Sequence, residues 1–310
     1  MRIFGFTSYG GPEVTGLLDV PDPVPGPGEV LVETRASGVN PADVKVRQGA
    51  RAGTIEVRFP MAMGREAAGV VLALGADVAG VVPGDPVFGA TSAGTGGLAE
   101  RVLLDAASLA RVPAGLDWGQ AACIPVSAGT AHDALDQLAL PIGSVLLVTG
   151  AGGGVGTSLL QLARARGLRV VGVASAGKRG TVERLGGEHV TSGEGWADRV
   201  RELAPTGADG LLDMVGGDVL RAAAGLLVEG GTPLSIADPG LAGELGGRGV
   251  TRRRTTQAFA EVAALAADGV LDIPVTAVIP LSRAGEAVAL VEQGHATGKV
   301  VVVPDDQLDG

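Results

Sequence analysis

Residues 144–167, SVLLVTGAGGGVGTSLLQLARARG, decide the fold. The first residues form a short apolar run typical of a buried strand. From about residue 155, apolar residues recur at helical spacing as far as Gly167. Between strand and helix, five glycines lie within residues 150–156. Glycines there allow a tight turn, bring backbone close to a pyrophosphate and let the helix pack against the sheet.

The stretch therefore predicts a dinucleotide site with the phosphates at the helix N-terminus, where free N–H groups and the helix dipole attract anions. The alternative is a purely structural turn. The cofactor-binding residues predicted here are Gly150, Gly152, Gly153, Gly154 and Val155.

The predicted secondary structure follows two different patterns along the chain. The first 120 residues or so read as short strands separated by turns, with one short helix at PADVKVRQG (41–49). From about residue 120, strands alternate with helices, including a helix predicted over residues 218–231. The first pattern indicates an antiparallel, barrel-like domain, and the second a doubly wound parallel sheet.

Composition limits the class of protein. Of 310 residues, 52 are Gly and 46% are hydrophobic, so a large core is expected and disorder is not. A net charge of −10 and a pI near 4.8 argue against a nucleic-acid or anionic membrane surface. The uncharged residues 137–163 are better explained by strand, turn and helix than by a membrane span, and no signal peptide is recognised. We expect a cytoplasmic globular protein.

Metal and disulfide chemistry are not expected. Cys123 is the one cysteine, so no disulfide forms within the chain, and its apolar surroundings predict a core residue. His132, His189 and His295 lack partners at ligand spacing, so no metal site is predicted.

The end of the second predicted nucleotide-domain strand indicates the cofactor. Sites that prefer NAD usually have an acid there, which binds the ribose 2′-hydroxyl. Here Ser175 is followed by Lys178 and Arg179, and the first acid is Glu183. A 2′-phosphate would be repelled by a carboxylate and attracted by these cations, so NADPH is the predicted cofactor. The alternative is a surface pair at the start of a helix.

The order of several motifs resembles a known family. GAGGGVGTSLLQLA (150–163), LLDMVGG (211–217) and the terminal GKVVVV (298–303) are similar to zinc-independent medium-chain dehydrogenase/reductases of the quinone oxidoreductase (zeta-crystallin-like) group. The resemblance covers nearly the whole chain. It implies a GroES-like catalytic domain of residues 1–122 and 257–310, a Rossmann domain of residues 123–256, and a homodimer.

The resemblance also implies site residues. Asn40, Asp43 and Arg47 match the segment that lines the family's cleft, and we predict them as catalytic residues; a helix cap with local hydrogen bonds is the alternative for the first two. Zinc-dependent relatives have a Cys near Asn40 and a His beside the Glu of GREAAG, where this chain has Arg65. A Tyr frequent in quinone reductases is Arg51 here.

Thr130 matches a threonine that contacts the nicotinamide in relatives; otherwise it is a hydroxyl on a helix surface. Further predicted cofactor positions are Ser192, which stands where relatives often have a second Tyr, Val215 and Ile236.

Together these features predict an NADPH-dependent reductase that transfers hydride to a quinone or other α,β-unsaturated carbonyl compound without zinc. The expected partner is a small-molecule acceptor, with no nucleic acid or membrane. Two alternatives remain open: an enoyl-thioester reductase of lipid or polyketide metabolism, and a non-catalytic NADPH-binding protein.

Overall fold

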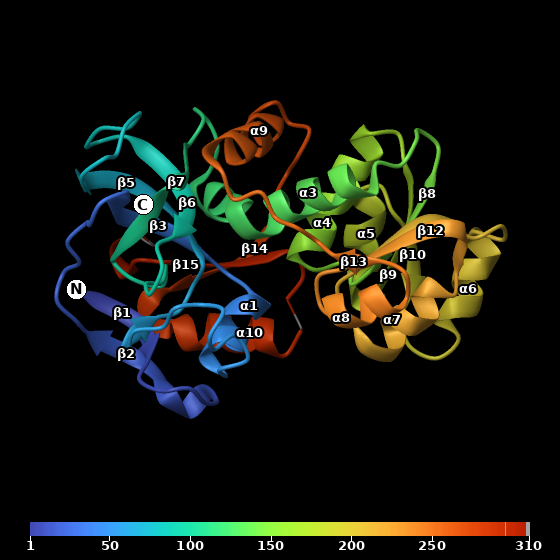
Figure 1. Cartoon of the computed structure of the whole chain (residues 1–310), viewed down its shortest axis with the longest axis horizontal. Helices are drawn as coiled ribbons and strands as arrows, with labels where there is room; N and C mark the ends of the chain where they lie inside the picture. Colours follow the sequence, from blue (N-terminus) through green and yellow to red (C-terminus); the bar gives the residue numbers. More distant parts are fainter. Residues whose placement is uncertain (295, 308–310) are drawn as a thin grey trace. The chain divides into compact units, whose positions relative to one another are not determined.

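The computed structural model describes residues 1–294 and 296–307, which form two compact units (Figure 1). Unit 1 contains residues 1–126 and 254–267 and the chain from Pro274 onward. Unit 2 contains residues 127–253 and 268–273.

Unit 1 is built on a closed ring of antiparallel strands. β3 (Glu29–Val39) pairs with both β5 (Glu66–Leu74) and β7 (Arg101–Arg111), and β6 (Pro86–Thr91) pairs with β5 and β7. Alternate side chains of these strands point inward and form a buried apolar cluster that includes Val32. The predicted antiparallel, barrel-like pattern is confirmed.

The last strand of the chain joins this sheet. β15 (Lys299–Val303) pairs antiparallel with the end of β3, so that Val300 faces Val39, and β14 (Val275–Pro280) pairs parallel with β15. As a result, the C-terminal strand lies beside the point where the chain leaves β3 and enters the first helix.

Helix α1 (Pro41–Arg47) begins at that point. Pro41 stands in the first turn, where its missing N–H costs nothing, and Asp43 lies near the positive end of the helix dipole. The remaining elements of unit 1 are β1 (Arg2–Phe6), β2 (Thr15–Asp19), β4 (Met61–Ala62), α2 (Trp118–Ala122), α9 (Thr256–Ala267) and α10 (Ala284–Glu292).

Unit 2 contains a six-stranded parallel sheet in the order β10-β9-β8-β11-β12-β13. Its strands are β8 (Val145–Thr149), β9 (Arg169–Ala174), β10 (Glu188–Thr191), β11 (Ala208–Asp213), β12 (Leu227–Ser235) and β13 (Arg248–Gly249). This order is that of a doubly wound nucleotide-binding sheet, and the chain reverses direction across the sheet beside β8. The predicted fold class is confirmed.

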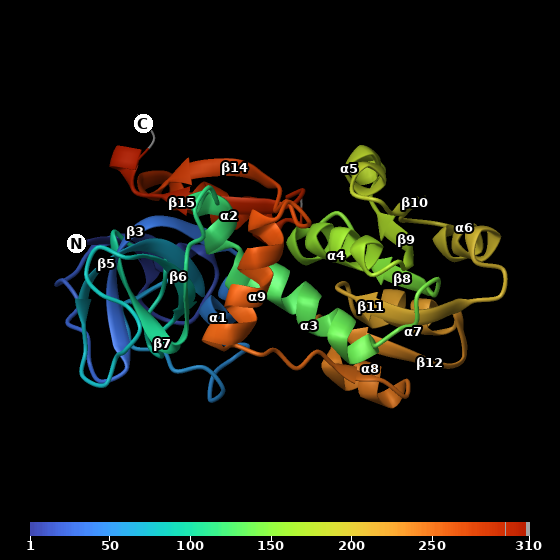
Figure 2. The same ribbon diagram turned by 90° about the horizontal axis from the view of Figure 1, so that it is seen from above.

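Helices cover both faces of that sheet; α5 and α8 lie on opposite sides of it (Figure 2). The helices of unit 2 are α3 (Gly129–Leu138), α4 (Gly154–Ala165), α5 (Arg179–Arg184), α6 (Trp196–Leu203), α7 (Gly217–Ala224) and α8 (Pro239–Glu244). No helix within the described residues is long and apolar enough to cross a membrane.

One predicted helix is wrong in its second half. The helix expected over residues 218–231 ends at Ala224, and Leu227 begins β12. β12 pairs in parallel with β11 on one side and β13 on the other. The hydrogen bonds of that pairing and the glycine at position 230, whose φ of 82° does not suit a helix, override the local helical pattern.

Candidate functional site

The glycine turn in unit 2 is shaped by close backbone contacts. Gly150 follows β8 with a φ of 77°, a conformation that favours glycine. A Cβ on Gly156 would lie 2.4 Å from the carbonyl oxygen of Ala151, so only glycine lets α4 pack this closely on the turn. The N-terminus of α4 is thus held at the carboxyl end of β8, as the sequence predicts for a dinucleotide site.

Lys178 lies against this turn. A Cβ on Gly152 would come within 2.6 Å of the Lys178 side chain, which is partly buried there. Burial lowers the pKa of Lys178. Arg179, by contrast, is exposed and pairs with Glu183 at 3.3 Å. The structure therefore brings one of the two predicted phosphate-binding cations to the glycine turn and directs the other along α5.

The other predicted cofactor positions follow the ends of parallel strands. Ser175 follows β9, Ser192 follows β10, Val215 lies shortly after β11, and Ile236 follows β12. These carboxyl ends meet at one edge of the sheet, the edge at which doubly wound folds bind ligands. Thr130 lies on α3 and is buried.

Asp213 organises that edge, and the sequence analysis assigned it no role. Its buried carboxylate accepts hydrogen bonds from Thr149 Oγ1 at 2.6 Å, Ser235 Oγ at 2.7 Å and the N–H of Gly216 at 3.0 Å. It thereby ties together the ends of β8, β11 and β12. The signal was an acid at the end of an apolar strand, in LLDMVGG.

In unit 1, Asn40 belongs to a buried polar cluster. Its Nδ2 donates to Glu66 Oε1 at 2.8 Å, and its Oδ1 accepts from Lys299 Nζ at 2.6 Å. Lys299 Nζ also donates to Glu66 Oε1 at 2.9 Å. Burial is the largest single effect and lowers the pKa of Lys299, but Glu66 and the other acidic groups around it together hold that pKa above its usual value.

Both ends of the Asn40 amide are therefore bound by the protein itself. Glu66 and Lys299 were missed as functional residues. The signal for each was a charge at the start of an apolar strand, in GREAAG and GKVVVV.

Asp43 differs from Asn40 because one of its side-chain oxygens accepts no hydrogen bond from the described residues. Its Oδ2 accepts from the backbone N–H of Asn40 at 2.8 Å, while its buried Oδ1 has no hydrogen-bond partner within the described part of the chain. Burial raises the pKa of Asp43 to about 7, helped by the charge of Glu66 and opposed by the Asn40 hydrogen bond. At neutral pH the carboxyl can thus hold a proton and also release it.

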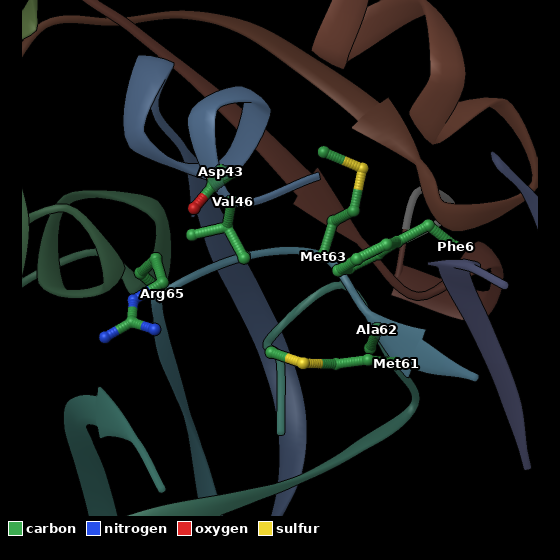
Figure 3. Close-up of a pocket in the computed structure, with 8 residues that line it drawn as sticks. Phe6, Asp43, Val46, Met61, Ala62, Met63 and Arg65 are labelled. Atoms are coloured by element: carbon green, nitrogen blue, oxygen red, sulfur yellow. The ribbon is translucent and has the colours of Figure 1, made fainter. Parts of the chain in front are cut away.

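A small pocket faces Asp43. Its lining residues are Phe6, Asp43, Val46, Met61, Ala62, Met63, Gly64 and Arg65 (Figure 3). Its cavity volume is about 10 Å³, which is room for about one water molecule and far below the roughly 300 Å³ of a typical small-molecule site.

Arg47 does not line this pocket. It is 1% exposed, donates to Gly10 O at 3.2 Å and pairs with Glu292 of α10 at 2.7 Å. The geometry favours a structural role for this residue, which fastens α1 to α10.

His132, Asp133 and Asp136 come close enough to offer ligand atoms to one ion. The sequence analysis did not expect this grouping. However, Arg253 pairs with Asp133 at 2.7 Å, and Arg166 with Asp136 at 2.7 Å, so cations of the protein already neutralise both acids.

Neither His189 nor Cys123 belongs to this group. His189 lies on β10, and His295 lies outside the described residues. Cys123 is fully buried, and burial raises the pKa of its thiol to about 12; the prediction of a core residue is confirmed.

Two family models match the chain: the alcohol dehydrogenase GroES-like domain over residues 26–114 and the zinc-binding dehydrogenase over residues 185–302. The chain is 36% identical to an erythronolide synthase of Saccharopolyspora erythraea over 91% of its own length, but it spans 8% of that protein. It is 30% identical to the quinone oxidoreductase of Homo sapiens over 98% of both chains.

The fold is also similar to a mycobacterial protein whose structure was solved in complex with NADPH. The two chains are 29% identical, and the match covers 98% of this chain and 100% of the other with a TM-score of 0.86. Sequence and fold agree over the full length, so the chain belongs to the quinone oxidoreductase-like group of the medium-chain dehydrogenase/reductase family, a family of NAD(P)-binding oxidoreductases.

Proposed function

We propose that the protein is an NADPH-dependent reductase of quinones or other α,β-unsaturated carbonyl compounds that works without zinc. The observation that carries the proposal is the packing of Lys178 on the glycine turn at Gly152, with no acid between the end of β9 and Glu183. A cation at this place suits a 2′-phosphate. The NADPH complex of the mycobacterial relative supports the same cofactor.

The residues present fit a dinucleotide. Gly156 lets α4 pack directly on Ala151 of the turn, and the N-terminus of α4 offers its first N–H groups there. The turn from Gly150 to Val155 would hold the pyrophosphate, Lys178 with Ser175 and Arg179 the 2′-phosphate, and Thr130 the nicotinamide end; Ser192, Val215 and Ile236 would complete the edge. When bound, NADPH supplies a hydride.

The residues at the positions of the relatives' zinc ligands do not fit zinc. An amide, Asn40, and a guanidinium, Arg65, stand there, and neither side chain is a usual zinc ligand. Asn40 is moreover held by Glu66 and Lys299. Reduction of a conjugated carbonyl compound also requires a proton, and Asp43 Oδ1 is a group in this unit that can hold one near neutral pH.

The cofactor proposal is tested by the Lys178→Glu variant. We expect it to weaken NADPH binding by about 100-fold and NADH binding by less than about threefold. Only NADPH has a 2′-phosphate, which loses its cation in this variant and is repelled by the new carboxylate. Fluorescence titration of each nucleotide gives the two dissociation constants. Arg184→Gln, on the exposed side of α5, is the matched control and should change neither. An equal loss for both nucleotides would remove Lys178 from the phosphate site.

The activity is tested by following NADPH oxidation with 1,4-benzoquinone and 2-cyclohexenone as acceptors. We expect turnover with at least one of them. NADPH binding without turnover of either acceptor, or of the thioester considered next, would instead favour the non-catalytic alternative.

A second function is favoured by the similarity to the erythronolide synthase, which is 36% identical to this chain over 91% of this chain's length. In that case the acceptor is an enoyl thioester. Reduction of crotonyl-N-acetylcysteamine without reduction of quinones or simple enones would select this candidate. We also propose a homodimer, which light scattering at several protein concentrations would test.

A further inference from the structure

Arg65 is an unusual charge in unit 1. It is partly buried and lines the pocket beside Asp43, and among the described residues its guanidinium has no hydrogen-bond or ion-pair partner. Other arginines of the same unit do have acids: Arg58 pairs with Glu56 at 2.6 Å and Arg111 with Asp85 at 2.7 Å. A desolvated cation without a partner is costly, which points to a ligand that completes it.

Asp43 attracts Arg65 but does not bind it directly. The two side chains lie on the same side of the pocket (Figure 3), yet they form no ion pair within 4 Å. The other nearby acid, Glu66, is already bound to Lys299 and Asn40. The positive charge of Arg65 therefore faces a pocket whose remaining walls are mostly apolar, such as Met61 and Met63.

Arg51 adds a second positive charge. It lies in the turn after α1, where its carbonyl oxygen accepts from the N–H groups of Thr54 at 3.0 Å and Ile55 at 2.9 Å. Its exposed side chain has no partner within the described residues. Burial is the main cause that lowers the pKa of Arg65; the charge of Asp43 opposes this shift, and the charge of Arg51 adds to it. An anion bound by both guanidinium groups would offset the desolvation of Arg65 and the repulsion between the two charges.

We propose that the acceptor reduced by this protein carries an anionic group, and that Arg65 and Arg51 bind it on the side of unit 1 where Asp43 lies. This rests on the proposed reductase function and names the substrate class. A guanidinium fork matches a carboxylate or a phosphate equally well, so the experiment must separate these two sources.

The first test measures binding and needs no turnover. Levulinate (4-oxopentanoate), a saturated keto acid, and its uncharged methyl ester are titrated into the protein by NMR. We expect levulinate to bind more tightly than the ester, and more weakly as salt is added. Arg65→Gln and Arg51→Gln should each raise the dissociation constant of levulinate about tenfold, the loss of one charge-assisted hydrogen bond, and leave that of the ester within twofold.

Arg58→Gln is the matched control, because Arg58 is an exposed arginine of the same unit with its own acid. Arg65→Lys guards against misfolding: it keeps the charge and should recover part of the affinity. Equal affinity for levulinate and its ester in the wild type, independent of salt, would overturn the proposal.

The second test uses turnover with NADPH. The acceptors are 4-oxopent-2-enoate and its methyl ester, and separately crotonyl-4′-phosphopantetheine and crotonyl-pantetheine, which differ by one phosphate. A preference of tenfold or more in kcat/KM within the first pair assigns a carboxylate, and within the second a phosphate. The same loss for charged and neutral acceptors in Arg65→Gln would instead place Arg65 at the carbonyl oxygen and overturn the anionic acceptor.

The two proposals fail differently. No turnover with any acceptor, combined with arginine-dependent binding of levulinate, contradicts the reductase and keeps the anion site. Turnover of neutral acceptors without preference for charged ones contradicts the anion site and keeps the reductase.

Discussion

At the scale of single residues, one short segment separates into three different environments. Asn40, Asp43 and Arg47 were predicted together as catalytic. In the structure, both ends of the Asn40 amide form hydrogen bonds, and Arg47 is paired with Glu292. Oδ1 of Asp43, by contrast, has no hydrogen-bond partner among the described residues. Helical spacing explains why Asp43 and Arg47 share a face of α1, but the partners come from α10 and β15, far along the chain. Local sequence does not contain them.

The raised pKa of Asp43 predicts a dependence of stability on pH. Its pKa is about 7 in the folded protein against an ordinary value of 3.8. Between these values the folded state keeps a proton that the unfolded state has lost, so stability falls as pH rises from about 4 to about 7. In Asp43→Asn this loss, on the order of a few kcal/mol, should be absent.

Urea unfolding of wild type and variant at pH 5, 6, 7 and 8 measures this difference. Asp268→Asn, an exposed acid outside the cluster, should follow the wild type. Parallel curves for wild type and Asp43→Asn would show that Asp43 titrates normally.

The pKa of Asp43 also predicts how kcat depends on pH. If Asp43 holds the proton that the acceptor takes up, kcat of the wild type should fall as pH rises above about 7, because the carboxyl is then ionised. Asp43→Asn should lower kcat by about 10²-fold or more and lose this pH dependence, with little change in NADPH affinity. A variant that keeps both the wild-type rate and its pH profile would exclude Asp43 as the proton donor.

At the scale of elements, the glycine turn with its strand and helix could be predicted, because glycine spacing and apolar periodicity are local properties. The start of β12 within the helix predicted at 218–231 could not be predicted from local sequence, because β12 is formed by its pairing with β11 and β13. The contact between Lys178 and Gly152 also could not be predicted from the sequence. Sequence predicted a cation in that region, but only the fold shows which one reaches the turn.

Two of the five glycines of this turn, Gly156 and Gly153, should respond differently to alanine. In Gly156→Ala the new Cβ meets the carbonyl oxygen of Ala151, and the turn or α4 must shift. We expect a loss of about 1–3 kcal/mol in stability, typical of overpacking, together with weaker NADPH binding. Gly153 has a φ of −87° and no atom closer than 3.5 Å to a built Cβ, so Gly153→Ala should keep its stability within about 0.5 kcal/mol. Urea unfolding of both variants decides this; equal effects would contradict it.

At the scale of the whole molecule, unit 1 is closed by contacts between distant parts of the sequence. Lys299 on β15 meets Glu66 on β5, and Glu292 on α10 meets Arg47 on α1. Asn40 stands between the first pair, so the orientation of its amide depends on a lysine more than 250 residues away. The apolar run of β15 could be predicted from sequence, but the partner of its buried lysine could not.

This closure predicts strong coupling between Glu66 and Lys299. Lys299→Met alone leaves the Glu66 carboxylate buried with its cation removed, and breaking a buried pair in this way costs about 3–5 kcal/mol. Adding Glu66→Gln removes the uncompensated charge, so the double variant should be more stable than Lys299→Met. Its total loss should then be smaller than the sum of the two single losses.

The exposed pair Arg283–Glu286, at 2.7 Å, is the matched control: the same substitutions there should have little effect and add independently. Urea unfolding of all four cycle members measures the coupling, and additive losses at Glu66 and Lys299 would show that the C-terminal strand is held by its apolar residues alone.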